Sequence, residues 1–582
     1  MGGIIWGSAR LPVIAFHMQT GCTLSGLIMN GLTIQWPPKM NNSMTSPYLA
    51  GPRTSFLWGC MAGALVTAPL LAIFYLGHQI LALPLVAFDI FDWLARVLPG
   101  SLLTFAIDSL LKFVIALHLG QSSSAAKSAE QTLAMLIMLL AGTLAGGIFF
   151  IVRRSRKGFA PGIVLTLIVG VPSALISYRM MHQNTAAVAL GLVWILAAFL
   201  IWGLTLNWVY LRIAAATDAA GTDASIVRIN RRQFMIRVGG TAAVITVAGT
   251  TLGRFLNRSG GEPAMQANQW SKNHPLPNAA ATVQPVPGTR PELTPLEKHY
   301  RIDIDTTTVR IHEAGWKLKV GGLVEEPREL TLDDLRRKYP STDQFITLSC
   351  ISNPVGGDLI GTQRWTGVSL QHLLPELRLK PTATHLKISS ADGFFETVAL
   401  NAIKSEERIM LAYAWDGVPL LPEHGFPLRI YIPDLYGMKQ PKWILSIDAI
   451  DQMQPGYWVE RGWDAKAQMQ STSVIDAVAQ NGLIKRDGRT FVPVGGIAHA
   501  GARGISKVEI RVDNGPWEEA QLRTPLSRLT WVLWRYEWPL QNGQHTFSVR
   551  CVDGSGLAQR TVEQPPHPSG ANGLHSIQRP IT

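Results

Sequence analysis

Long uncharged runs dominate residues 54–212, whereas residues 290–580 mix apolar and polar positions as globular domains do. A helix needs roughly 20 apolar residues to cross a bilayer, and six runs come close to that length. These runs predict transmembrane helices at 55–77, 101–119, 131–152, 161–181, 186–211 and 236–254. The run 101–119 is the weakest of the six because it carries Asp108 and Lys112.

At 582 residues the chain is too long for one compact domain. The pattern predicts an N-terminal extension, an all-α transmembrane bundle, a Pro-rich linker, an α+β domain and a β-sandwich. These parts are expected at 1–50, 51–254, 255–295, 296–460 and 461–582. Within the extension, Met40 or Met44 could equally be the biological start.

The formal net charge of +12 does not indicate nucleic-acid binding, because no Lys/Arg stripe interleaved with aromatics occurs in the globular half. Much of the excess flanks hydrophobic runs, as membrane topology signals do. The last run, "NRRQFMIRVGGTAAVITVAGTTLG" (230–253), has paired arginines before a mildly apolar stretch and resembles an internal twin-arginine export signal. An ordinary helix with positive-inside flanks is the alternative. Both interpretations put residues after about 254 outside the cytoplasm, and so predict a multi-pass protein of the cell membrane.

Four widely spaced cysteines form no disulfide framework, and no CxxC or HExxH spacing suggests a zinc site held by the protein alone. Paired histidines within a membrane can bind haem b. His78, His118 and His182 lie near or beyond span ends. A single histidine in such a place is more often structural, so haem b is the less favoured interpretation.

The globular half predicts short strands and helices in alternation. "TLDDLRRKY" (331–339) has a Thr N-cap, an acidic first turn and a basic end, which indicates a short helix. Strands are expected at 316–324, 344–350 and 426–437, and a strand, a turn and a second strand at 385–400. After residue 466, alternating strands with Asn-Gly turns predict a β-sandwich.

Cys350 stands out in "TLSCISNPVGGDLIGTQRW" (347–365), at the end of an apolar strand and before a glycine-bearing loop. Its thiolate could be a nucleophile or a soft metal ligand. A nucleophile needs a nearby base, and His372, His385 or His424 could serve.

A second segment, "EHGFPLRIYIPDLYGMKQPKW" (423–443), surrounds a predicted strand with basic side chains. His424, Arg429, Lys439 and Lys442 suit an anionic, phosphate-bearing cofactor. Scattered surface charge is the alternative, and spacing alone does not decide between the two.

Both segments resemble those of the sulfite oxidase superfamily of molybdopterin enzymes, and the likeness extends over 296–560 through "HYRIDIDT", "LKVGGLVEEPRELTLDDL" and "ISKVEIRVDNGPWEEA". The order, with helices first, is similar to the membrane-anchored bacterial branch of that superfamily. The resemblance implies a sulfite-oxidase-type molybdopterin domain followed by an immunoglobulin-like dimerisation domain, and therefore a homodimer.

The resemblance also implies roles for individual residues. Cys350 would bind molybdenum beside the pterin dithiolene and oxo groups. Tyr300, Arg301, Asn353 and a weaker contact at Ser389 or Ser390 would line the cofactor pocket. The pterin phosphate would be held by His424, Arg429, Gln440, Pro441 and Lys442. Tyr413, Arg301 and Arg364 would act on the substrate.

The implied activity is oxygen-atom transfer coupled to two-electron transfer, on a small oxyanion or oxo substrate. Pro354 and Val355 stand where sulfite-oxidising members carry basic residues, so sulfite itself is in doubt. A reductase of sulfoxides or other oxo compounds is one alternative, and a cofactor-free scaffold protein is another. Because no cytochrome b5-like motif precedes the domain, we expect a separate electron carrier: a c-type cytochrome, or a membrane quinone or haem protein.

Overall fold

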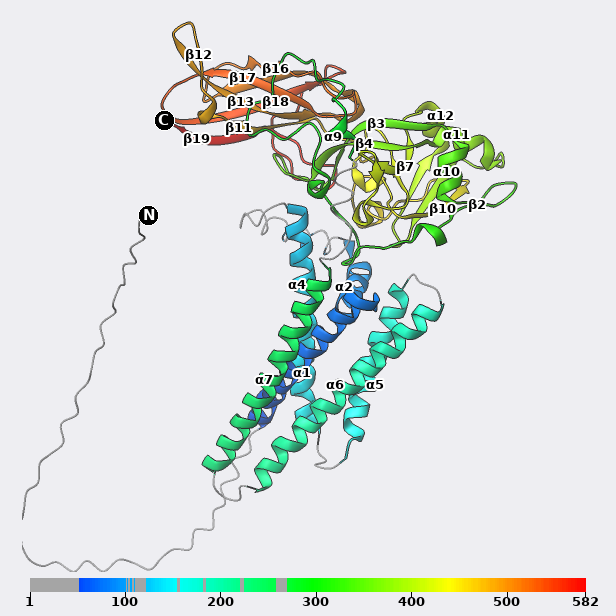
Figure 1. The fold of residues 1–582 in the computed structure, drawn as a ribbon, viewed down its shortest axis with the longest axis vertical. Helices are drawn as coiled ribbons and strands as arrows, with labels where there is room; N and C mark the ends of the chain where they lie inside the picture. The colour runs from blue at the N-terminus through cyan, green and yellow to red at the C-terminus, as the bar shows by residue number, and fades with distance from the viewer. Residues whose placement is uncertain are drawn as a thin grey trace, which may run out of the picture. The chain divides into compact units, whose positions relative to one another are not determined.

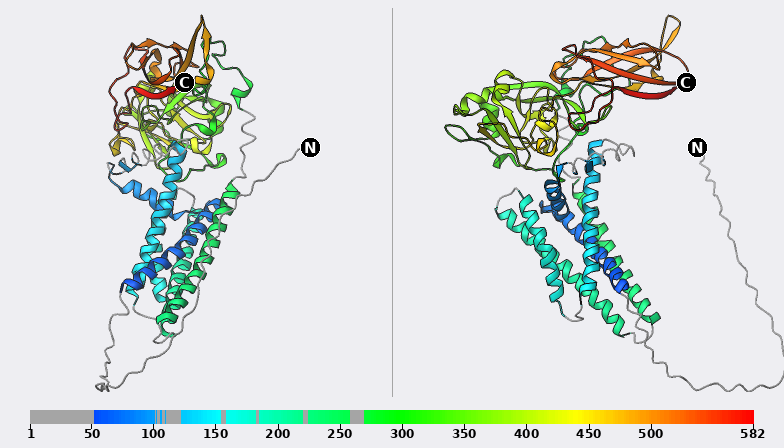
Figure 2. Two further views of the ribbon diagram at one scale, coloured as in Figure 1. Left: turned by 90° about the vertical axis from the view of Figure 1, so that its left-hand side faces the viewer. Right: turned by 180° about the vertical axis from the view of Figure 1, so that it is seen from behind.

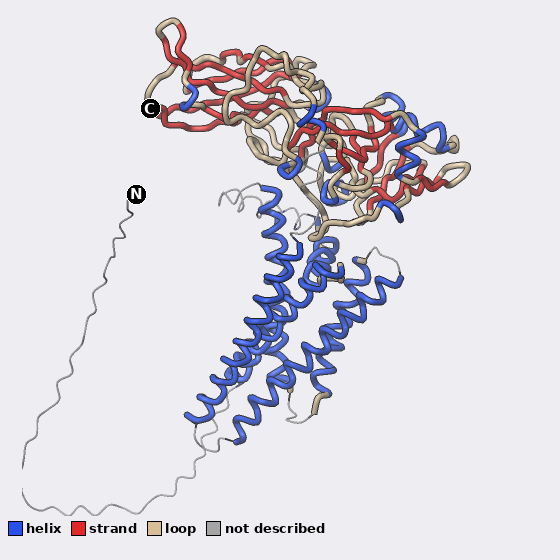
Figure 3. The backbone as a smooth tube through the Cα atoms, viewed as in Figure 1, coloured by secondary structure: helices blue, strands red, loops and turns tan. Residues whose placement is uncertain are grey.

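The computed structural model describes residues 52–100, 102, 105–106, 109, 122–153, 158–181, 185–219, 224–257 and 269–582. The predicted N-terminal extension, most of the run 101–119, and the two histidines His118 and His182 lie outside these residues. Helices fill the described part before residue 258, and strands dominate after residue 317 (Figure 3).

The described part of the first half contains six helices (Figure 1): α1 (Pro52–Leu81), α2 (Val86–Val97), α4 (Ser122–Val152), α5 (Ala160–Met180), α6 (Thr185–Ala219) and α7 (Ala224–Asn257). All except α2 contain a segment long and apolar enough to cross a membrane. These segments agree with five of the six runs predicted from the sequence. The twin-arginine-like stretch forms part of the continuous helix α7.

Glycines let α1 and α4 approach each other closely. A Cβ added at Gly63 would lie 2.4 Å from the carbonyl oxygen of Gly142, and one at Gly146 would lie 2.4 Å from that of Gly59. Small residues at such contacts allow helix backbones to pack by van der Waals contact, as in membrane helix pairs.

The α+β domain holds two sheets of five strands. The first has the order β2-β1-β10-β5-β6, with β1 and β10 parallel and the other pairs antiparallel. Its strands are β1 (Leu318–Gly322), β2 (Arg328–Leu330), β5 (His385–Ser390), β6 (Phe395–Ala399) and β10 (Ile444–Ile450). The second has the order β3-β4-β7-β8, with β9 also paired to β7. Its strands are β3 (Ser341–Ser349), β4 (Ile360–Ser369), β7 (Met410–Trp415), β8 (Val418–Pro419) and β9 (Arg429–Tyr431).

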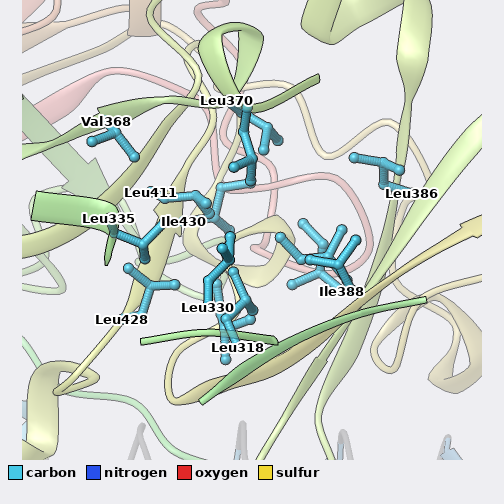
Figure 4. Close-up of a cluster of buried hydrophobic side chains, with 14 of the residues drawn as sticks. Leu318, Leu330, Leu335, Val368, Leu370, Leu386, Ile388, Leu411, Leu428 and Ile430 are labelled. Carbon is cyan, nitrogen blue, oxygen red and sulfur yellow. The ribbon is translucent and has the colours of Figure 1, made fainter. Parts of the chain in front are cut away.

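Three short helices complete the domain: α10 (Leu332–Lys338), α11 (Leu370–Leu373) and α12 (Leu400–Ser405). Thr331 caps α10 in a capping box with Asp334, as the sequence predicts. The main core lies between the two sheets and includes Leu318, Ile388, Leu411 and leucines of α10 and α11 (Figure 4). A separate buried cluster on the second sheet contains Cys350.

The C-terminal part is a two-sheet β-sandwich (Figure 2). One sheet has the order β11-β13-β17-β16 with β12 on β13, and the other has the order β15-β14-β18-β19. The strands are β11 (Thr472–Val478), β12 (Ile484–Arg486), β13 (Arg489–His499), β14 (Ile505–Val512), β15 (Glu518–Glu519), β16 (Gln521–Leu522), β17 (Val532–Pro539), β18 (Gly543–Asp553) and β19 (His575–Ile581). Val494, Trp534 and Phe547 pack in the shared core, which agrees with the predicted sandwich.

The predicted linker differs from expectation where it is described. Residues 269–295 pack against the globular domains instead of standing free. Arg523 of the sandwich pairs with Glu292 at 3.0 Å and donates to the carbonyl oxygens of Asn278, Ala281 and Val283. The Trp270 ring lies 5.8 Å from that of Phe345 on β3. This segment is therefore an arm that belongs to the globular part.

Candidate active site

Cys350 follows the last residue of β3, where the chain turns back toward β4. Its N–H donates to the carbonyl oxygen of Leu359 at 2.9 Å. The Asn353 side chain accepts from the Leu359 N–H at 2.9 Å and closes the loop between the strands. Asn353 therefore has a structural role here, beside the cofactor contact implied by resemblance.

The Cys350 thiol is buried, and its Sγ lies 3.0 Å from the Ser352 hydroxyl. Burial raises the pKa of the Cys350 thiol, although hydrogen bonding from Ser352 partly opposes this. A thiol with a raised pKa is a poor free nucleophile, whereas a metal ion that binds it displaces the proton.

The histidines considered as bases do not form a dyad with this thiol. His372 lies 3.6 Å from Glu407, and His385 Nδ1 lies 2.8 Å from the Thr384 hydroxyl. Among the described residues, the groups that hydrogen-bond the Cys350 Sγ belong to Ile351 and Ser352, and none is a histidine. The arrangement favours a ligand role for Cys350 over nucleophilic catalysis.

Buried cations gather around a single carboxylate. Asp303 has a fully buried side chain that pairs with both Arg301 and Lys442. Burial opposes ionisation, but the charges of Lys442 and Arg301 outweigh it and hold the Asp303 pKa below its ordinary value. Arg429 donates to the carbonyl oxygen of His424 at 3.1 Å and has no ion-pair partner among the residues described. The cluster thus carries more positive than negative charge.

Two buried histidines lie beside these cations. The rings of His299 and His424 are 5.4 Å apart, and both contact Trp415. Burial, with a contribution from the Arg429 charge, lowers the pKa of His299 to about 3. Burial and neighbouring positive charge likewise hold the pKa of His424 well below its ordinary value. Both rings are neutral at pH 7, so the positive charge of the site comes from arginine and lysine.

The donor set fits an anionic pterin cofactor with a thiolate-bound metal. Burial lowers the pKa of Arg429 to about 10, so its guanidinium is still charged at pH 7. A phosphate would supply the negative charge that these buried cations lack. Two buried polar atoms, Ser390 Oγ and Gln440 Oε1, have no hydrogen-bond partner in the described structure and could bind polar edges of such a group.

Other residues of the predicted pocket occupy fixed places. Gln440 donates through Nε2 to the Leu435 carbonyl at 2.8 Å, and the Pro441 carbonyl accepts from the Ile430 N–H at 3.1 Å. Ser389 pairs with Ser446 of β10 in the first sheet. Lys439 pairs with buried Glu396 at 2.7 Å. Lys439 is therefore already neutralised, unlike Arg429.

Two residues assigned to the substrate do not join the Cys350 cluster. Tyr413 packs in the core between the sheets, and its hydroxyl lies 3.2 Å from that of Ser341. Arg364 pairs with Asp343 at 2.5 Å and lies over the Trp270 ring. Since neighbouring residues on a strand face opposite sides, Arg364 points away from the side on which Trp365 joins Cys350.

The tyrosines beside Cys350 are Tyr300 and Tyr436. Burial raises the pKa of each, with a further contribution from the Cys350 charge. Sequence reasoning found Tyr300 but missed Tyr436, which its position in "DLYG" within the predicted cofactor segment could have suggested. Tyr436 packs with Ile351 and Trp463, and the Trp463 indole N–H is buried without an acceptor in the described part.

Of the three histidines considered for haem b, His78 lies within the described residues. His78 Nδ1 lies 3.0 Å from the Leu83 carbonyl oxygen, a local contact at the end of α1. No group of three or more metal-ligating His, Cys, Asp or Glu side chains occurs within the described residues.

Comparison with known proteins identifies the type of domain that contains these residues. A family model for the oxidoreductase molybdopterin binding domain matches residues 305–458. The uncharacterized oxidoreductase YuiH of Bacillus subtilis is 31% identical over 148 residues, which cover 25% of this chain and 72% of YuiH. The mitochondrial sulfite oxidase of Homo sapiens is 26% identical over 306 residues, covering 45% of this chain.

The match spans 55% of the human enzyme, so just over half of its length is represented. Among solved structures, sulfane dehydrogenase SoxCD from Paracoccus pantotrophus aligns with a TM-score of 0.44 and 18% identity, covering 56% of this chain and 93% of that one. On the family model and the similarity to YuiH, the chain belongs to the sulfite oxidase superfamily of molybdopterin-dependent oxidoreductases.

Proposed function

We propose that the chain is a membrane-anchored enzyme that transfers an oxygen atom and two electrons at a molybdopterin site outside the cytoplasm. The observation that carries the proposal is the buried Cys350 thiol within the same domain as a surplus of buried cations. Five helices of sufficient length and apolarity support membrane anchoring. Basic residues before 158 and within 228–237 support a cytoplasmic side for those helix ends.

Each residue of the site has a distinct task in this proposal. Cys350 supplies the protein thiolate for the metal, and the loop closed by Asn353 holds it in place. Arg429 and Lys442 hold the cofactor phosphate, while neutral His424 donates or accepts a hydrogen bond. The bound cofactor supplies the metal centre that exchanges an oxygen atom and two electrons with the substrate.

The substrate side of the site is less basic than a sulfite pocket would require. Arg364 pairs with Asp343, and Pro354 and Val355 lie within the loop between Cys350 and Leu359. Ile351, next to Cys350, packs with Tyr436 and Trp463 in a buried apolar cluster, and the Trp463 indole N–H has no acceptor in the described part. Apolar surroundings with a neutral donor favour reduction of a neutral oxo compound, such as a sulfoxide, over oxidation of sulfite. Because Arg364 pairs with Asp343, and Arg429 and Lys442 are assigned to the cofactor phosphate, Arg301 is the cation left to bind an oxyanion substrate.

Electrons would come from a separate carrier, and the β-sandwich would serve as an immunoglobulin-like dimerisation domain. A homodimer and a c-type cytochrome or membrane carrier follow from the resemblance to the superfamily.

The test uses the full chain purified in detergent from a host that makes molybdopterin. Turnover of a sulfoxide and other oxo compounds with reduced dye is compared with sulfite oxidation by ferricyanide. The proposal predicts molybdenum and pterin in the protein and faster turnover of the oxo compounds. A protein with neither metal nor pterin would instead be a scaffold, and sulfite turnover faster than that of every oxo compound would reverse the substrate assignment.

A further inference from the structure

A partly open apolar cavity lies among the helices of the first half, apart from the cysteine site. Its volume is about 210 Å³, and it is bounded by α1, α2, α4, α5 and α6. Its wall is almost entirely carbon, with Phe91, Phe199 and Trp202 as the aromatic residues. A cavity of roughly 150 Å³ with such walls is dry and can hold one benzene ring. This space is therefore large enough for one substituted six-membered ring.

One hydroxyl group of the cavity wall, that of Thr67, is held in a fixed orientation and can still donate a hydrogen bond. The Thr67 hydroxyl accepts a hydrogen bond from the Trp202 indole N–H at 3.0 Å. Among the described residues its own hydrogen has no recorded acceptor, although Thr67 is only 1% exposed. Close contact with Gly142 also fixes the hydroxyl, since a Cβ there would lie 2.2 Å from the Thr67 oxygen. A carbonyl oxygen on a ring in the cavity could accept this hydrogen.

Helix α2 connects the cavity to the segment that reaches the cysteine site. Ile90, Phe91 and Leu94 line the cavity from one face of the helix. The other face carries Asp92 and Arg96, in keeping with the helical repeat. With 12 residues, α2 is too short to span a membrane.

The polar face of α2 holds residues 305 and 306. Asp92 accepts from the N–H and hydroxyl of Thr306, with an N···O distance of 2.9 Å for the N–H. Arg96 donates to Asp305 at 2.5 Å and to the Asp392 carbonyl at 2.9 Å. Two residues earlier in the chain, Asp303 pairs with Lys442. A continuous set of contacts thus runs from the cavity wall to the cofactor cations.

We propose that this cavity binds the ring of a quinone-class electron carrier, with Thr67 as the hydrogen-bond donor to one ring carbonyl. The inference rests on the proposed function, because it assigns the carrier for that same reaction. A lipid-soluble ring can enter from a bilayer, and a quinone exchanges two electrons, the number that oxygen-atom transfer requires.

The overall exchange balances in either direction. In reduction, an oxo substrate and a quinol give the deoxygenated substrate, a quinone and water, so both quinol hydrogens end in the water. In oxidation, substrate, water and quinone give the oxygenated substrate and quinol. Two electrons pass between ring and substrate in both cases.

The test is photolabelling of the full chain in phosphatidylcholine nanodiscs with an azido-substituted decylubiquinone, competed by decylubiquinone. Labelled residues are mapped by mass spectrometry, with and without molybdenum in the protein. We expect label on α2, α4 or α6 residues of the cavity wall in both forms. If the chain takes up no molybdenum from a competent host and the cavity is still labelled, the quinone site stands and the proposed function fails.

Matched variants distinguish quinone binding in the cavity from labelling of the lipid-facing surface of the helices. Ala145→Phe fills the cavity from α4 and should reduce competed labelling by about tenfold or more. Ala197→Phe adds the same ring at an exposed position of α6 and should leave labelling unchanged. Thr67→Val, which keeps the shape of the side chain, should raise the half-maximal quinone concentration about tenfold.

The inference is overturned if Ala145→Phe and Ala197→Phe label alike, or if the competed label lies outside the cavity. It is also overturned if a photoactivatable acyl chain labels the wall and decylubiquinone does not displace it, which would identify a lipid-tail cavity. If Ala145→Phe does not yield folded protein, the map on the unchanged chain and the Thr67→Val titration decide the question.

Discussion

Replacing Asp303 by asparagine tests the charge balance of the site most sharply. The substitution Asp303→Asn keeps the shape of the side chain but removes the charge that neutralises Lys442 and Arg301, which both pair with the carboxylate. Removing one partner of a buried pair costs about 3–5 kcal/mol. Lys442 and Arg301 have side chains 14% and 25% exposed, so we expect the lower end, about 3 kcal/mol, in cofactor-free protein.

The cofactor should reduce this cost because its phosphate supplies negative charge to the same cations. Thermal unfolding of the full chain in detergent should show Asp303→Asn lowering Tm by about 6 °C or more without cofactor, and by less than half of that with it. Asp333→Asn is the control, since its pair with Arg337 is exposed and worth about 0–1 kcal/mol. An equal loss of Tm with and without cofactor would refute the anion-site reasoning, as would no loss in either form.

Three further predictions concern single side chains. Tyr436→Phe should lower kcat/KM severalfold because Tyr436 lies beside Cys350. Tyr413→Phe should leave kcat/KM within about twofold because Tyr413 packs between the sheets. The reverse ranking of the two variants in steady-state assays would contradict this placement. Arg364→Gln should leave the KM for an oxyanion unchanged while Arg301→Gln raises it, and a larger effect of Arg364→Gln would show that the arginine turns toward the substrate. Burial raises the pKa of Asp392 to about 7, so the folded state holds this proton more tightly than the unfolded state and loses stability as the pH rises from about 4 to 7. The free energy of unfolding of Asp392→Asn should therefore rise relative to that of the native chain by up to about 1.4 kcal/mol per pH unit in that window. Denaturant unfolding that shows a pH-independent difference between the two proteins would refute the assignment.

Local patterns in the sequence predicted the elements but not which faces of them meet. The capping residues of α10, the apolar run that ends β3 and the alternation in β5 are encoded within a few positions, and these elements occur where expected. Tyr413 lies at a register shift between β4 and β7, where an extra residue on β7 changes which side chains face the core. No pattern within one strand reveals that shift, so the Tyr413 assignment depended on the resemblance alone.

Long-range contacts explain the other differences. The proline-rich composition of 255–295 predicts an extended linker, but Arg523, more than 200 residues later, binds the described part of it. The ion pair between Asp303 and Lys442 joins the segments around residues 301 and 442. The resemblance placed both segments in one pocket, but no local pattern indicated that Asp303 is the partner of Lys442. Cys350 was identifiable because a thiol at a strand end before a glycine-bearing loop is a local feature.

The central claim is that Cys350 binds molybdenum, and X-ray absorption at the molybdenum edge of the purified full chain tests it directly. The account predicts about one molybdenum per chain, with sulfur neighbours that include one thiolate beyond the two of the pterin. Cys350→Ser should lose that third sulfur and the matching charge-transfer absorption. Molybdenum absent from the unchanged chain, or an identical sulfur shell and absorption spectrum in Cys350→Ser, would contradict the account.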